Sequence, residues 1–311
     1  MKEIRNAVPQ RTLVREDAST RLTYKLPLEG GYITSLMKIV TWNINSLRLR
    51  IDLLRKLAYE HQPDIILLQE TKVADSLFPL EVIKNIGYEH VIYSGQKSYN
   101  GVAIISKFPL NNVFSLELYN SDKRHIAAIV NDIEIHNFYV PAGGDIPDIE
   151  VSTKFKHKLE YVRLMQEWLT TNRTKNDKMI IAGDLNIAPH EHDVWSSKQL
   201  RNVISHTDIE RSLLVELQNV LGFIDTSRHF VSLDEKFYTW WSYKNIDWKK
   251  SNRGRKLDHI WVSDNLKGAL FSMHLLLEAR DWSSPSDHVP YFVTFNLQML
   301  HRGLTTGASS K

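Results

Sequence analysis

Residues 179–189 join a short apolar run to a carboxylate and a carboxamide. Residues 179–182 are wholly apolar, and Asp184 and Asn186 follow before Pro189 ends the segment. An apolar run between turn residues is typical of a buried strand, which a proline cannot continue in the middle of a sheet. Alternation along such a strand would point both polar side chains toward one substrate atom. An Asx-rich turn explains the same residues, and this stretch alone leaves both interpretations open.

More acids stand at the ends of expected strands. Glu70 and Asp258 each border an apolar run, and Asp287 and His288 lie side by side near the C-terminus. The sequence contains no cysteine, which excludes thiolate metal sites, disulfides and a cysteine nucleophile. Buried carboxylates without thiolates indicate a hard cation, Mg2+ or Mn2+, and such ions favour phosphate chemistry.

These residue types fit the hydrolysis of a phosphate ester. A metal ion and a cationic imidazole would stabilise charge on a pentavalent phosphoryl group, and a carboxylate would position or deprotonate the attacking water. Each residue alone has a structural explanation: Glu70 as a salt-bridged strand end, Tyr139 as a packed aromatic ring, Asn43 as a helix cap. Together they favour a site, because polar groups at several strand ends cost free energy unless they serve one another.

The hydrophobic periodicity predicts one α/β domain over residues 37–298. Helices are expected at residues 51–58, 79–87, 154–171 and 209–221. Strands are expected at residues 38–45, 65–71, 90–94, 102–106, 125–130, 133–140, 179–189, 238–243, 257–262 and 291–297. Residues 1–36 are predicted to be a poorly ordered N-terminal extension and residues 299–311 a C-terminal tail.

Composition and charge set only broad limits. The chain has 311 residues, a net charge of +3 and a pI of about 8.8, which permits an anionic partner without requiring one. No apolar run approaches the roughly 20 residues of a membrane span, and no secretory h-region is present. A cytoplasmic protein without a membrane partner is therefore expected.

Seven motifs occur in order and carry a family resemblance. They are Thr41–Arg48 (TWNINSLR), Leu68–Lys72 (LQETK), Gly101–Ala103 (GVA), Tyr139–Pro141 (YVP), Gly183–Ile187 (GDLNI), Leu257–His259 (LDH) and Ser286–Pro290 (SDHVP). Together they resemble the bacterial exodeoxyribonuclease III branch of the exonuclease-endonuclease-phosphatase superfamily, over residues 37–298. The resemblance implies an α/β four-layered sandwich, in which two facing β-sheets are flanked by helices and the site lies at one edge.

The resemblance also implies a role for each matching residue. Glu70 would be the principal Mg2+ ligand, with Asp287 and Asp184 beside the metal. Asn45 stands at the margin of this site, because some relatives carry aspartate there and an amide is a weaker ligand. Asp184 would activate the water, with Asn43 and Asn186 orienting it. Tyr139 would contact the phosphate. His288 would stabilise the phosphoryl charge, and Asp258 would orient that imidazole.

Residues 240–256 are the candidate DNA-binding surface. Tryptophans alternate there with lysines and arginines, and cations bind phosphates while exposed aromatic rings stack on bases. A solvated basic loop beside core tryptophans is the alternative. By resemblance, Trp240 and Leu257 would wall a pocket for a base-less sugar. Some relatives have an aromatic residue at the position of Arg255. The cations of Lys72 and Arg253 would contact phosphates.

The sequence thus predicts a Mg2+-dependent DNA phosphodiesterase of base-excision repair, in which Mn2+ could replace Mg2+. Expected activities are 3′→5′ exonuclease on double-stranded DNA, abasic-site endonuclease and 3′-end trimming, by a monomer acting on abasic sites or 3′ ends. A phosphatase or lipid phosphodiesterase is the alternative that residues 240–256 disfavour, and a non-catalytic DNA-binding relative is disfavoured by the intact acid set. Residues 190–193 are not expected to bind a second metal, since their spacing matches no zinc pattern.

Overall fold

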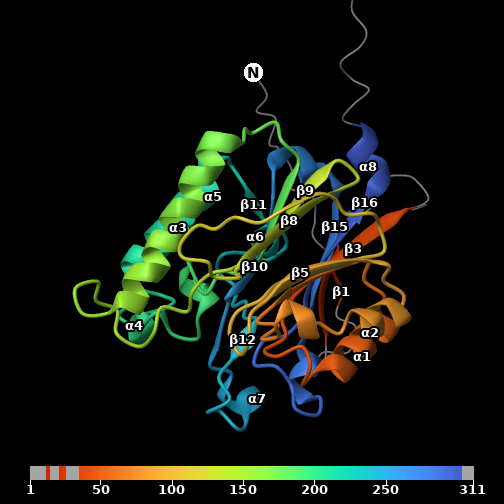
Figure 1. The fold of residues 1–311 in the computed structure, drawn as a ribbon. Coiled ribbons are helices and arrows are strands. Elements are labelled where there is room, and N and C mark those ends of the chain that lie inside the picture. The colour runs from red at the N-terminus through yellow and green to blue at the C-terminus, as the bar shows by residue number, and fades with distance from the viewer. Residues whose placement is uncertain (1–11, 15–20, 26–34, 303–311) are drawn as a thin grey trace, which may run out of the picture.

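Two β-sheets pack face to face, with helices on both outer sides (Figure 1). The computed structural model describes residues 12–14, 21–25 and 35–302. The larger sheet has the strand order β1 (Thr12–Val14), β2 (Arg21–Lys25), β15 (Leu270–Leu276), β16 (Tyr291–Asn296), β3 (Leu36–Asn43), β4 (Ile65–Gln69), β6 (Val102–Ser106) and β5 (His90–Ser94). The smaller has the order β11 (Ile224–Asp225), β14 (Asp258–Val262), β10 (Met179–Asp184), β9 (Ile133–Tyr139), β8 (His125–Val130) and β7 (Asn111–Phe114).

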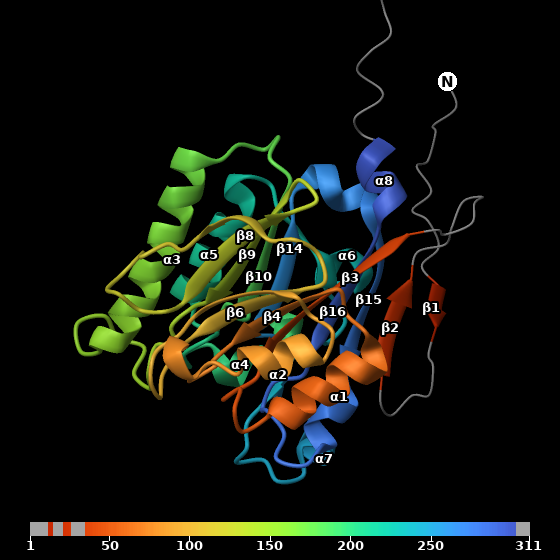
Figure 2. The same cartoon turned by 45° about the vertical axis from the view of Figure 1, so that its right-hand side comes forward.

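The helices form the two outer layers (Figure 2). α1 (Ile51–His61) and α2 (Leu80–Asn85) cover the larger sheet, and α3 (Thr153–Asn172) and α5 (Asp208–Val220) cover the smaller. Shorter elements connect the strands: α4 (Ser197–Leu200), α6 (Thr226–Phe230), α7 (Trp248–Ser251), α8 (Leu297–Arg302) and the strand pair β12 (Trp240–Trp241) and β13 (Gly254–Arg255). The predicted four-layered α/β sandwich is confirmed.

The wholly apolar strands are apolar because both of their faces are covered. In β4, Ile65 and Leu67 face the core between the sheets, while the intervening Ile66 and Leu68 pack with α1 and α2. β10 alternates in the same way between the inter-sheet core and the cluster beneath α3 and α5. Both strands are therefore held rigidly where their polar ends begin.

Most expected elements are found close to their predicted bounds, and the differences are local. The expected strand at 238–243 shortens to β12, and β7, β11, β13 and β15 have no counterpart among the expected strands. β15 gains its position from pairing with β16 and β2, which are distant in sequence. β1 and β2 belong to residues 1–36, so part of that segment joins the larger sheet. The other residues up to 34 lie outside the part of the chain that the structure describes. The domain boundaries stay a prediction. None of the described helices combines the length and apolar character that a bilayer span requires.

Candidate active site

Strand register brings the polar strand ends together. Asp184 at the end of β10 lies opposite Tyr139 of β9 on one side and Asp258 of β14 on the other. In the larger sheet, Asn43 at the end of β3 lies opposite Gln69, so Glu70 emerges at the same edge. The amide Nδ2 of Asn43 donates to Oδ2 of Asp184 at 2.9 Å, which joins the two sheets at this edge.

Asp184 is almost fully buried and accepts several hydrogen bonds. Its Oδ1 accepts from the backbone N of Asn186 at 3.0 Å, and its Oδ2 accepts from Nδ2 of Asn186 at 3.2 Å. Asn186 has a left-handed φ of 54°, so the strand has ended and the extended alternation expected here is wrong. Both interpretations of this stretch therefore hold in part: an Asx turn forms, and it places the amide on the acid. Burial raises the pKa of Asp184 to about 7, although the charge of His288 and the hydrogen bond from Asn43 act to lower it.

His288 lies between two carboxylates. Its Nδ1 is 2.7 Å from Oδ2 of Asp258, and its Nε2 is 3.7 Å from Oδ2 of Asp184. Burial lowers the pKa of His288, but the carboxylates of Asp258 and Asp184 outweigh it and raise the pKa to about 10. The ring is thus held as a buried imidazolium, with one nitrogen fixed by Asp258 and the other beside Asp184.

Glu70 anchors the second half of the site. Its carboxylate accepts a short hydrogen bond from the hydroxyl of Tyr139, and its Oε2 lies 2.7 Å from Nζ of Lys72. Burial would raise the pKa of Glu70, yet the bonds from Lys72 and Tyr139 lower it overall. Glu70 has a φ of 51°, a conformation that costs free energy and is often found at functional sites.

The oxygen atoms around Lys72 fit a hard divalent cation. Nζ of Lys72 lies 2.7 Å from both Oε2 of Glu70 and Oδ1 of Asn45, so a positive charge already sits where these oxygens converge. Nδ2 of Asn45 donates to Oδ1 of Asp287 at 3.1 Å, which brings a second carboxylate to the same place. Carboxylate and amide oxygens are ligands that Mg2+ and Mn2+ accept. Lys72 is also a predicted DNA contact; in this structure its ammonium pairs with Glu70.

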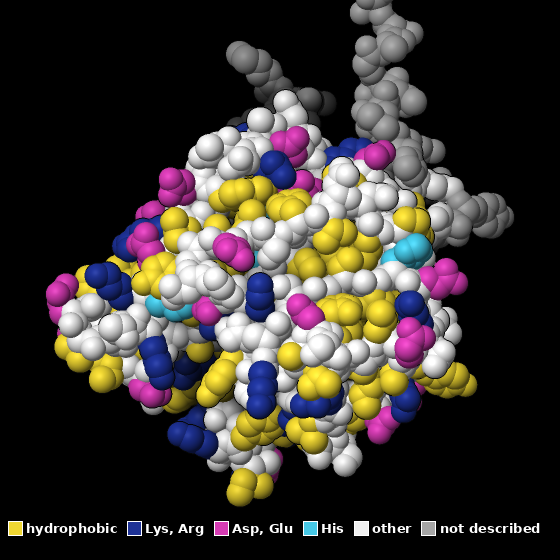
Figure 3. All heavy atoms as spheres, in the orientation of Figure 1, with side chains coloured by type: hydrophobic (Ala, Val, Ile, Leu, Met, Phe, Trp, Pro, Cys, Tyr) yellow, Lys and Arg dark blue, Asp and Glu magenta, His cyan; other side chains and the backbone are white. Residues whose placement is uncertain are grey.

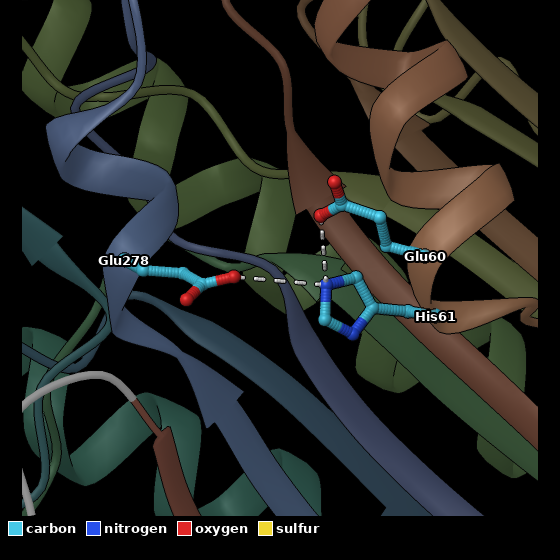
Figure 4. Close-up of side chains that lie close together, drawn as sticks. All are labelled: Glu60, His61 and Glu278. Atoms are coloured by element: carbon cyan, nitrogen blue, oxygen red, sulfur yellow. Dashed lines mark ion pairs between the residues drawn. The ribbon is translucent and has the colours of Figure 1, made fainter. Parts of the chain in front are cut away.

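Two other groups of acidic side chains lie elsewhere in the described structure, and the first of them could also hold a metal ion. Glu60 and Glu278 lie 4.0 and 3.9 Å from Nε2 of His61, on the outer side of the larger sheet (Figure 4). In the expected non-metal segment 190–193, Asp193 is buried and forms an ion pair with Arg228. Neither group lies with the strand-end acids.

A cleft of about 620 Å³ opens over these residues. It is lined by Glu70, Asp184, Asn186, Asp287 and His288, together with four of the predicted DNA-binding residues: Trp240, Arg253, Arg255 and Leu257. Figure 3 shows Lys and Arg side chains on the part of this face that lies between α4 and α7. A basic wall thus adjoins the acid cluster, as a phosphate backbone would require.

The basic-aromatic segment divides between cleft and core. Trp240 is half-buried, and its Nε1 donates to Oδ2 of Asp287 at 2.9 Å. Trp241 and Trp248 are buried, however, and Lys256 is fully buried in an ion pair with Asp225. The interpretation of core tryptophans is therefore correct for Trp241 and Trp248, whereas the buried Lys256 belongs neither to a solvated loop nor to the cleft surface.

A buried ion pair that no sequence pattern indicated lies beneath the site. Nζ of Lys158 on α3 lies 2.5 Å from Oε1 of Glu210 on α5, and both side chains are fully buried. Lys158 also donates to the backbone oxygens of Asn186 at 2.8 Å and Ala142 at 3.2 Å. It therefore ties two loops of the cleft to the helical layer. A lysine within an amphipathic pattern would have indicated only an exposed helix position.

Removing this lysine should destabilise the fold. We expect Lys158→Met to lower the free energy of unfolding by about 3–5 kcal/mol, because it leaves the buried Glu210 carboxylate without a counter-charge. Urea unfolding followed by circular dichroism measures the change. The double variant Lys158→Met/Glu210→Gln should regain part of the loss; equal stability of Lys158→Met and the unsubstituted protein would show that the pair contributes nothing.

Comparison with known proteins decides the family. A sequence profile of the endonuclease/exonuclease/phosphatase family matches residues 40–288. Exodeoxyribonuclease III of Haemophilus influenzae is 31% identical over 272 residues, which cover 83% of this chain and all of that protein. The chain belongs to the endonuclease/exonuclease/phosphatase family. The assignment made from the sequence motifs is thereby confirmed, as is the prediction of a nuclease-type hydrolase.

Solved structures agree with this assignment. An AP endonuclease from Archaeoglobus fulgidus has a TM-score of 0.78 at 31% identity, with 84% of this chain and 99% of that chain covered. The 3′–5′ exonuclease NExo from Neisseria meningitidis has a TM-score of 0.78 at 34% identity, over 84% of this chain and all of that chain. A variant of Neisseria NExo, described as a 3′ phosphatase bound to a product DNA hairpin, has a TM-score of 0.76 at 33% identity.

Proposed function

We propose that this member of the family is a Mg2+-dependent DNA phosphodiesterase of the exodeoxyribonuclease III type. It would remove nucleotides from 3′ ends of double-stranded DNA, cut 5′ to abasic sites and trim blocked 3′ ends. The proposal includes a monomer that acts in the cytoplasm, with Mn2+ as an alternative ion.

One observation carries the proposal: acids from three separate segments line one cleft that has a basic wall, and a fourth lies buried behind His288. Glu70, Asp184, Asp258 and Asp287 come from both sheets and from a late loop, yet their carboxylates gather around His288 and Lys72. A shallow active site for small phosphate esters would not need the cationic wall, whereas a nucleic-acid backbone binds to one.

The side chains suggest a division of labour for in-line hydrolysis. Asp184 would hold the attacking water and accept its proton, with Asn43 and Asn186 fixing the carboxylate. The His288 imidazolium would stabilise charge on a phosphoryl oxygen, held in orientation by Asp258. Burial, together with the Glu70 carboxylate, raises the pKa of Tyr139 well above its ordinary value, so its hydroxyl remains a donor.

Glu70 and Asp287 would hold the metal ion, with Asn45 at the margin. When bound, the ion would supply positive charge to the phosphoryl oxygens as the phosphorus becomes pentavalent. The hydroxyl of the water would then remain on phosphorus and the P–O3′ bond would break, which leaves a 3′-hydroxyl on the strand.

A gel assay on defined duplexes tests the proposal. A duplex with one internal abasic analogue, a nicked duplex and a duplex with a 3′-phosphate should each be processed in Mg2+ and remain intact in EDTA, because the acid cluster needs a counter-cation to accept a phosphate. Hydrolysis of inositol phosphates or sphingomyelin without any DNA cleavage would overturn the proposal. DNA binding without turnover in either Mg2+ or Mn2+ would also overturn it.

A further inference from the structure

Arg255 brings an uncompensated positive charge to the wall of the cleft. Its guanidinium lies 5.4 Å from the ring centre of Trp240, which in turn donates to Asp287. Within residues 12–14, 21–25 and 35–302, no carboxylate forms an ion pair with Arg255. Glu210 acts on it at longer range, but Lys158 already neutralises that acid. A half-buried cation in this position would be stabilised by a ligand that supplies the counter-charge.

The guanidinium is fixed in place on one side only. Its Nη1 donates to the backbone oxygen of Ile204 at 3.0 Å and to Oγ of Ser205 at 2.7 Å. Its Nε has no hydrogen-bond partner among the described residues. Because Nε is buried, Nη2 is the donor that remains for a ligand in the cleft, where it can give a carboxylate or a phosphate a charge-assisted hydrogen bond.

The surroundings of Arg255 make its charge selective. Trp240, Leu257 and Trp195 line the same cleft with largely apolar surface. A neutral sugar placed there would cover the guanidinium without balancing its charge, which costs free energy. A group with its own negative charge would balance it, in surroundings where water screens the interaction poorly.

We propose that Arg255 is a specificity-determining residue, which favours 3′ ends whose phosphate carries a second anionic group over a neutral base-free sugar. This inference rests on the proposed nuclease function. The reaction is unchanged: the hydroxyl of water adds to phosphorus, the P–O3′ bond breaks, and a proton ends on the 3′ oxygen. The released phosphate ester carries the second anion, which Arg255 binds during the reaction.

Three duplexes separate this role from general damage to the site. One ends in a 3′-phosphoglycolate, which has a carboxylate beyond the phosphorus; one ends in a 3′-phosphate, which has nothing beyond it; one contains an internal tetrahydrofuran abasic analogue, which is neutral. We expect Arg255→Leu to lower kcat/KM for the phosphoglycolate end by about tenfold or more relative to the 3′-phosphate end. Cleavage of the tetrahydrofuran duplex should fall by a smaller factor, because its neutral sugar offers no second anion to Arg255.

Two further variants sharpen the result. Arg255→Lys should keep part of the preference, because it retains a charge but not the planar guanidinium that Ile204 and Ser205 hold in place. Arg253→Leu removes a cation from the same wall, where Arg253 lies 4.8 Å from the ring centre of Trp195, and should weaken cleavage of all three duplexes alike.

The inference is overturned if Arg255→Leu changes all three duplexes by the same factor, or leaves the phosphoglycolate-to-phosphate ratio as it was. If the unsubstituted protein cleaves the duplexes normally and Arg255→Leu gives either of these results, this inference fails and the nuclease function stands. Failure of the unsubstituted protein to cleave any of the duplexes removes both.

Discussion

Replacing Asp184 with asparagine is expected to lower kcat on an abasic duplex by about 10³- to 10⁴-fold, the range of a well-placed general base. The amide keeps the size of the carboxylate and can remain beside Asn43 and Asn186, but it cannot accept a proton from water. It also removes the charge that lies 3.7 Å from Nε2 of His288. Single-turnover cleavage in saturating Mg2+ measures the loss.

The matched control for this variant is Asp132→Asn. Asp132 is exposed in the turn between β8 and β9, at the opposite end of β9 from Tyr139, and its φ of 63° suits asparagine equally well. This change should leave kcat within about twofold, since surface changes away from special features have small effects. Activity of Asp184→Asn equal to that of Asp132→Asn would refute the role given to Asp184.

The second large effect is expected from Glu70→Gln. The Mg2+ concentration needed for half-maximal cleavage should rise by at least about tenfold, because Glu70 is the carboxylate that faces the convergent oxygens. The substitution also breaks the ion pair of Lys72, so that its ammonium competes less well with Mg2+ for the same place. This opposes the shift, but the loss of the carboxylate is the larger effect. A titration of activity against Mg2+ measures the shift.

The metal titration distinguishes the two acids. Excess Mg2+ should restore much of the activity of Glu70→Gln and almost none of that of Asp184→Asn, because only the first loses metal affinity. The control is Glu278→Gln, which removes a carboxylate from the cluster around His61 and should leave the Mg2+ dependence unchanged. If the Mg2+ dependence shifted as much for Glu278→Gln as for Glu70→Gln, the functional ion would lie in the cluster around His61 and the role given to Glu70 would be refuted.

The strand framework could be predicted because local patterns specify it. The apolar runs at residues 65–68 and 179–182 require burial on both faces, and the polar residues that end them mark one edge. The resemblance then supplied what the runs could not: that two sheets face each other and that the polar strand ends meet at one edge. Asn43 and Asp184 are 141 positions apart, and no local pattern implies their hydrogen bond.

Most of the features that escaped prediction depend on contacts between residues distant in sequence, and one depends on local backbone conformation. Lys158 has an ordinary sequence context, and only its approach to Glu210 from another helix makes it a buried support of the cleft. Lys72 turns toward Glu70 because both residues adopt left-handed conformations after β4. The basic residues of 240–256 separate into inward and outward groups only once Asp225 provides a partner for Lys256.

The most direct test of the central claim is the position of a bound ion. Crystals of the protein grown with Mn2+ would show the ion by its anomalous scattering, and the account predicts one peak coordinated by Glu70 in the cleft that holds Asp184 and His288. The same peak should weaken or vanish in Glu70→Gln. A peak at Glu60, His61 and Glu278, with none beside Glu70, would contradict the claim that the converging strand ends form one metal-assisted phosphodiesterase site.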